Sequence, residues 1–120
     1  MQIREAQKRV ADLNRKMRRR PLDNPDFGGL WNHLREELDE IWKEYDRGTK
    51  QGLFEELADA QVLLLALTHS AGADMETELE AKMNINEQRT WTPPDEEGVI
   101  RHATDPRTPI SDDGTTSDET

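Results

Sequence analysis

Apolar residues recur at intervals of three and four along much of the chain, which is the period of an amphipathic α-helix. This pattern predicts a helix over residues 2–18 and a second over residues 30–45, with Gly48 as a stop after the second. The first stripe consists of Ile3, Ala6, Val10, Leu13 and Met17, and the second of Leu30, Trp31, Leu34, Leu38, Ile41, Trp42 and Tyr45.

Two further helices are expected after these. Residues 18–29 contain two prolines and a Gly-Gly pair, so we expect a connecting loop there. After a turn at 49–52, residues 53–71 predict a third helix, whose second half is apolar on nearly every side, as in a helix surrounded by others or buried between subunits. Asp74 is placed to cap a fourth helix that continues to about Arg89.

The expected fold is therefore all-α, a four-helix bundle-like subunit without strand alternation or an internal repeat. We expect a helical domain over residues 1–91 and a Pro-rich, acidic C-terminal extension over residues 92–120. The last dozen residues are too polar to offset their ordering entropy and are expected to be disordered.

The composition restricts the partners. The formal charge of −10 disfavours nucleic acid and anionic membrane, and the chain has no cysteine for a disulfide or a thiolate zinc site. The longest apolar run, residues 62–67, is shorter than the ~20 residues that span a bilayer, and the N-terminus lacks a secretory signal, so we expect a soluble, cytoplasmic protein. Only 32% of residues are apolar, so the core is expected to be small or shared between subunits. Together with the apolar third helix, this favours a homodimer or homotetramer over a monomer.

Two groups of carboxylates occupy successive predicted helices. Glu36, Glu37 and Glu40 form Glu-Glu-x-x-Glu on the second, and Glu56 and Asp59 form Glu-x-x-Asp on the third. Residues three apart share a helical face, so each pair can project together. Glu and Asp at this spacing are most often a solvated face, but Asp59 lies just before the apolar run, where an unpaired carboxylate costs several kcal/mol or takes up a proton.

If the two helices pack antiparallel, four carboxylates meet around one space, and their repulsion calls for cations. Hard oxygen ligands select Mg²⁺ or Mn²⁺, which leave positions open for phosphate oxygens and water. A di-iron carboxylate bundle is the near alternative, but such proteins use Glu-x-x-His, whereas here His33 precedes Glu36 in the reverse order.

The sequence resembles the MazG-type nucleoside triphosphate pyrophosphohydrolases, the all-α NTP pyrophosphatase group. The resemblance covers roughly residues 1–104. The residues that carry it are Glu36-Glu37-x-x-Glu40, Glu56-x-x-Asp59, and the segment KMNINEQRTW at 82–91, which is similar to that family's Lys-Met-x-x-Asn-x-x-Arg stretch.

The resemblance implies Mg²⁺-dependent cleavage of a nucleotide between its α and β phosphates, giving a nucleoside monophosphate and pyrophosphate in nucleotide-pool housecleaning. It implies that Glu37, Glu40, Glu56 and Asp59 are the metal ligands. Glu36, beside them, is expected to orient or deprotonate the attacking water, although a metal-bound water is already acidified by its cation. The preferred base and sugar are left open.

Lys82, Asn86 and Arg89 share one face of the predicted fourth helix, where they can bind triphosphate oxygens. The alternative is that Lys82 and Arg89 are surface partners of acidic groups. Trp31 and Trp42 are candidates for stacking on the base, against the commoner alternative that they belong to the core.

Two other functions remain open at this stage. One is a noncatalytic helical interaction module that uses the acidic surface and the apolar third helix only to assemble. The other is the di-iron carboxylate protein. His33 and His69 are expected to be packing or surface residues.

Overall fold

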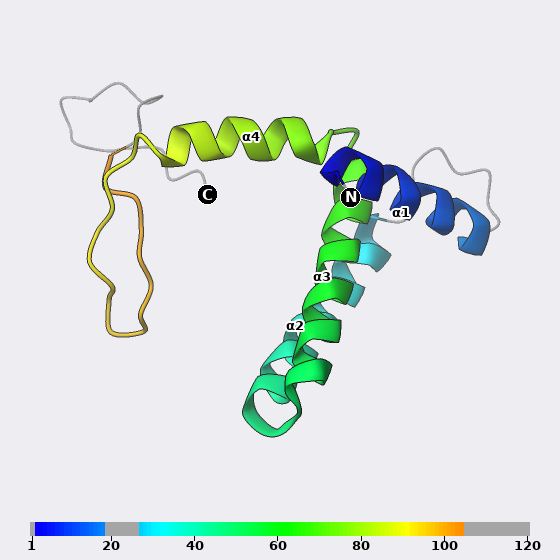
Figure 1. The fold of residues 1–120 in the computed structure, drawn as a ribbon, viewed down its shortest axis with the longest axis horizontal. Coiled ribbons are helices and arrows are strands. Elements are labelled where there is room, and N and C mark those ends of the chain that lie inside the picture. Colours follow the sequence, from blue (N-terminus) through cyan, green and yellow to red (C-terminus); the bar gives the residue numbers. More distant parts are fainter. Residues whose placement is uncertain (1, 19–26, 105–120) are drawn as a thin grey trace. The chain divides into compact units, whose positions relative to one another are not determined.

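The computed structural model describes residues 2–18 and 27–104. These form four helices in chain order: α1 (Ile3–Arg18), α2 (Phe27–Arg47), α3 (Lys50–Ser70) and α4 (Met75–Asn86) (Figure 1). They are followed by a hairpin-like arm over residues 90–104, with an isolated antiparallel bridge between Trp91 and His102. The expected all-α, four-helix subunit is confirmed. The chain divides into two compact units, Met1–Glu76 and Thr77–Thr120.

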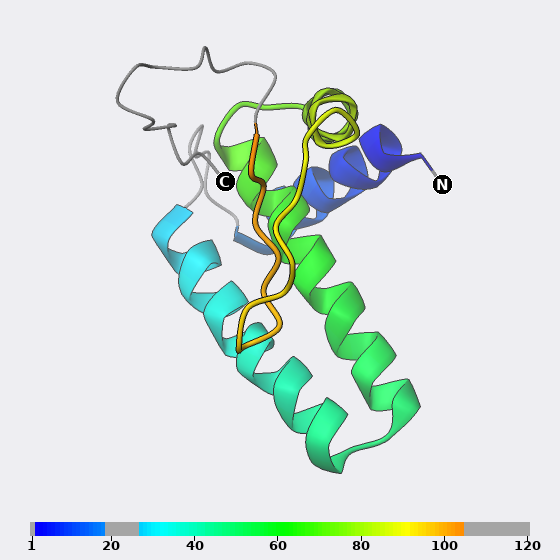
Figure 2. The same cartoon turned by 90° about the vertical axis from the view of Figure 1, so that its left-hand side faces the viewer.

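Helices α2 and α3 form an antiparallel hairpin that is the centre of the first unit (Figure 2). One face of α2 and the second half of α3 provide most of the core, and α1 packs on α3. The apolar stripe of α1 contributes less than the sequence suggests, because Leu13 and Met17 are exposed. The buried cluster consists of Val10, Leu30, Leu34, Ala60, Leu63, Leu65, Ala66 and Leu67.

The turn between α2 and α3 is stabilised by its own polar groups. The hydroxyl of Thr49 accepts a hydrogen bond from the amide of Gly52 and so caps α3. The carboxylate of Glu44 bends over the turn and accepts from the Thr49 amide at 3.3 Å. A side chain at Gly48 would collide with this carboxylate and would place its Cβ 2.9 Å from the Glu44 Cα, so the turn needs glycine there.

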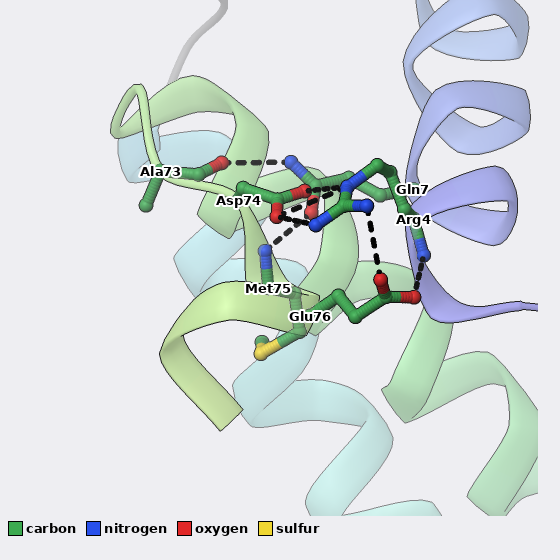
Figure 3. A network of polar contacts seen from close by, with 6 residues as sticks. All are labelled: Arg4, Gln7, Ala73, Asp74, Met75 and Glu76. Atoms are coloured by element: carbon green, nitrogen blue, oxygen red, sulfur yellow. Dashed lines mark hydrogen bonds and ion pairs between the residues drawn. The ribbon is translucent and has the colours of Figure 1, made fainter. Parts of the chain in front are cut away.

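Helix α1 binds the segment that starts α4 (Figure 3). Gln7 is buried, its amide nitrogen donates to the Ala73 carbonyl at 2.8 Å, and its oxygen accepts from the Met75 amide at 2.7 Å. Arg4 forms ion pairs with Asp74 at 2.9 Å and Glu76 at 3.1 Å. These contacts hold residues 73–76, the C-terminal end of the first unit, against α1.

The arm of the second unit is held by polar contacts. Asp95 pairs with Arg101 at 2.6 Å and accepts from the Val99 amide, and these contacts hold the pKa of its carboxyl below the ordinary value. Gly98 adopts the left-handed conformation, φ 79°, that closes the turn. Thr92 and Thr104 add side-chain hydrogen bonds at the open end.

Several boundaries differ from the expectation. Helix α2 starts at Phe27, so the Gly-Gly pair assigned to a loop is helical, and α3 starts at Lys50 because Thr49 caps it within the expected turn. Helix α4 ends at Asn86 rather than near Arg89. The second half of α3 is not buried on every side, since Val62 and Leu64 are exposed. The expected disorder of the last dozen residues lies outside the described residues.

None of the helices in residues 2–18 and 27–104 has the length and apolar character needed to cross a membrane.

Candidate functional site

Three carboxylates meet between α2 and α3. Glu37 comes from α2, and Glu56 and Asp59 come from α3, one turn apart. One oxygen from each lies within 4.8 Å of the others, close enough for a single ion to contact all three. The antiparallel packing expected from the sequence produces this meeting, because Glu37 lies on the α2 stripe that faces α3, next to Leu34.

The proximity of these groups changes the acidity of Glu56. Its hydrogen bond with the Glu37 carboxyl, its partial burial and the repulsion of the charges on Glu37, Asp59 and Glu40 raise the pKa of Glu56 to about 7. Without a cation, a proton on Glu56 relieves the repulsion at neutral pH. The cluster of carboxylates therefore favours the binding of a positive charge, either a proton or a cation.

The donor set fits a divalent cation. Glu37 is only 15% exposed, and once Glu56 is ionised and can no longer donate to it, the Glu37 Oε2 atom is buried without a hydrogen-bond partner among the described residues. A buried, unpartnered carboxylate oxygen beside two further carboxylates is the arrangement that a hard metal ion satisfies. Asp59, expected in an enclosed position, is exposed, so the cluster is reached from solvent.

Glu40 lies at the edge of this cluster. It is exposed and forms an ion pair with Lys43 at 3.5 Å, yet it is near enough to contribute to the raised pKa of Glu56. Glu40 is thus close to the three carboxylates without belonging to the 4.8 Å group. Its role as a fourth ligand stays a prediction.

Glu36 lies on α2 outside the group formed by Glu37, Glu56 and Asp59. It is exposed and borders a surface hollow of about 600 Å³ whose lining comes from the same helix. The lining residues are Asn32, Arg35, Glu36, Leu38 and Asp39. Its role toward the attacking water stays a prediction.

One contact at the site was not anticipated from the sequence. His33 lies one turn before Glu37 on α2, and its Nε2 atom is 3.4 Å from Glu37 Oε1. The four-residue spacing was available in the sequence and predicts such a pair. His33 is exposed, in agreement with the expectation of a packing or surface residue, but that expectation did not include its contact with Glu37.

The chain is similar to a solved enzyme. No protein-family model matches the sequence, and no curated protein matches it either. Among solved structures, the chain matches a cyanophage S-2L MazG-like pyrophosphohydrolase that is bound to dGDP and three catalytic Mn²⁺ ions per active site. The TM-score is 0.67 at 29% identity, over 85% of this chain and 92% of that one. This chain has the fold of a MazG-like pyrophosphohydrolase. The resemblance stated from the sequence is confirmed.

The second unit of this MazG-like fold contains the residues predicted to bind phosphate. Arg89 is buried, at 7% exposure, and its Nη1 atom donates to Asn86 Oδ1 at 2.7 Å. Lys82 is half-buried on α4. Arg89 lies beyond the end of α4, and Asn86 and Arg89 are joined by this side-chain hydrogen bond and by a turn hydrogen bond from the Arg89 amide to the Asn86 carbonyl at 3.2 Å. Their roles stay predictions.

The two tryptophans predicted to stack on the base are on the surface of α2. Trp31 is 49% exposed and Trp42 is 68% exposed, and the Trp42 and Tyr45 ring centroids are 5.6 Å apart. With Leu38 they form an exposed apolar stripe, consisting of Trp31, Leu38, Trp42 and Tyr45. Neither tryptophan belongs to the buried cluster of this MazG-like subunit.

Proposed function

We propose that this protein is a Mg²⁺-dependent nucleoside triphosphate pyrophosphohydrolase that cleaves (d)NTP to (d)NMP and pyrophosphate. The observation that carries the proposal is the meeting of Glu37, Glu56 and Asp59 on a MazG-like fold. The matched cyanophage enzyme binds dGDP and Mn²⁺, which supports a nucleotide substrate and a divalent cation for this chain as well.

The ligands of the cation would be Glu37, Glu56 and Asp59, joined by Glu40. When bound, Mg²⁺ or Mn²⁺ neutralises phosphate charge and acidifies water. The carboxylates themselves supply the negative charge that gathers cations between α2 and α3. Glu56 must give up its proton as a cation binds, because the hydrogen bond with Glu37, the partial burial and the repulsion that raise its pKa all favour the protonated carboxyl over the ionised ligand.

The remaining residues would handle substrate and water. Glu36 orients or accepts a proton from the attacking water, and Lys82, Asn86 and Arg89 bind triphosphate oxygens. The hydrogen bond from Arg89 to Asn86 supports a joint role, because it limits the rotamers of both side chains. A guanidinium held in this way can donate to two phosphate oxygens.

The exposed stripe on α2 supports an oligomer and a surface for the base. Four large apolar side chains at helical spacing on one face are typical of a protein interface. A homodimer or homotetramer would cover this stripe, and Trp31 or Trp42 could then stack on the base at its margin. In the cell, the enzyme would act in the cytoplasm on the nucleotide pool, without nucleic-acid or membrane partners.

A calorimetric titration with Mn²⁺ tests the proposed site. Wild-type protein is expected to bind Mn²⁺, whereas Glu56→Gln and Asp59→Asn each weaken binding by at least about tenfold, because each removes a ligand charge. Glu55→Gln is the matched control, since Glu55 is exposed and contacts Gln51 at 3.5 Å rather than the cluster. Absence of Mn²⁺ binding, or equal binding by all four proteins, would favour the noncatalytic interaction module.

A further inference from the structure

His33 is the basic neighbour of the carboxylate cluster. It lies one turn before Glu37 on α2, so the helix places both side chains on the same face. The distance between His33 Nε2 and Glu37 Oε1 is 3.4 Å. His33 is 57% exposed and Glu37 is 15% exposed, so the contact lies at the outer edge of the cluster.

The two oxygens of Glu37 have different environments. Oε1 is near His33, whereas Oε2 is buried and, with Glu56 ionised as a bound cation requires, has no hydrogen-bond partner among the described residues. A carboxylate that is fixed through one oxygen cannot rotate freely, so the other keeps its direction. Carboxylates that bind metals are commonly oriented in this way by a neighbouring donor.

We propose that His33 is a positioning residue, which holds the Glu37 carboxylate by Oε1 and so leaves Oε2 available to a divalent cation. This inference rests on the proposed function, because it assigns the cation to the same cluster. The contact needs only an N–H at Nε2, which the imidazolium and one neutral tautomer both supply. His33 touches neither substrate nor cation in this role.

The test is Mn²⁺ affinity without nucleotide, measured by calorimetry at pH 8. His33→Ala is expected to weaken Mn²⁺ binding about tenfold, in the range of other residues that orient metal ligands. His33→Gln keeps an N–H donor at similar reach and is expected to stay within about threefold of wild type. His69→Ala, an exposed histidine in the last turn of α3, is the control and should bind as wild type does.

The kinetic readout separates positioning from substrate binding. In His33→Ala, the Mn²⁺ concentration for half-maximal activity should rise about tenfold, while KM for nucleotide at saturating Mn²⁺ stays unchanged. Wild-type Mn²⁺ affinity in His33→Ala, or failure of His33→Gln to restore affinity, would overturn the role of His33 alone. If wild-type protein binds no Mn²⁺, the proposed function fails, and the role of His33 fails with it.

Discussion

At the scale of single residues, the decisive feature is the Glu56 carboxyl, which lies close to the carboxyls of Glu37 and Asp59. Helical spacing in the sequence predicts that Glu37 shares a face with Glu40, and Glu56 with Asp59. It does not tell which member of each pair is buried. In the structure Glu37 and Glu56 are half-buried, while Glu40 and Asp59 are exposed, because burial depends on how far each side chain lies from the α2–α3 contact.

The raised pKa of Glu56 makes stability depend on pH. In the metal-free protein, folding raises this pKa from 4.5 to about 7, so the folded state holds more protons between these values. The stabilisation is fully present below pH 4.5 and is lost as pH rises through about 7. Urea unfolding across this window should show a steeper fall in the free energy of unfolding for wild type than for Glu56→Gln.

Glu55→Gln serves as the comparison for this pH series and should follow wild type. Saturating Mn²⁺ should remove much of the difference in the pH dependence of the free energy of unfolding between wild type and Glu56→Gln at pH 7–8. The reason is that the cation replaces the proton in neutralising the cluster. Parallel pH profiles for wild type and Glu56→Gln would show that Glu56 does not titrate in this range.

At the scale of elements, the sequence predicts helices well where an apolar stripe is continuous. Helix α1 is found within a residue of its expected bounds. Helix α2 starts at Phe27, before the expected residue 30, because a glycine inside a helix costs only ~1 kcal/mol relative to alanine and the Gly-Gly pair is therefore tolerated. The arm at 90–104 has no alternating apolar pattern; hydroxyls and the Asp95–Arg101 pair hold it, and these are not visible as a period.

The contact between α1 and the start of α4 should be important for stability. Replacing Gln7 by alanine leaves the Ala73 carbonyl and the Met75 amide without their partner, and we expect a loss of about 1–3 kcal/mol in the free energy of unfolding. Arg4→Ala removes exposed ion pairs and should cost less than about 1 kcal/mol. Chemical denaturation measures both, and an equal cost for the two variants would contradict this assignment.

At the scale of the whole molecule, the acidic residues behind the formal charge of −10 differ in their proposed roles. In the proposed function the acids between α2 and α3 would bind cations, and a bound cation would reverse the local sign where a triphosphate has to lie. An acidic protein can therefore act on a small polyanion. The sequence predicts this fold through two spaced acidic motifs on adjacent helices, but the base that is selected depends on contacts that the spacing does not determine.

The exposed stripe on α2 predicts self-association. Light scattering should give a mass of about two or four times 13.8 kDa for wild type. Trp42→Glu places a charge in the stripe and should reduce the mass, whereas Asp46→Ala, also exposed on α2, should leave it unchanged. A wild-type mass of 13.8 kDa would show that the stripe is not a self-association surface.

The most direct test of the proposed pyrophosphohydrolase activity is the identity of the phosphate product. Phosphorus NMR of the protein with Mg²⁺ and a panel of ribo- and deoxynucleoside triphosphates should show pyrophosphate and a nucleoside monophosphate appearing together at equal rates. Both signals should vanish in Glu56→Gln and persist in Glu55→Gln. Orthophosphate with a nucleoside diphosphate would contradict α–β cleavage, and no product from any triphosphate would contradict the enzyme itself.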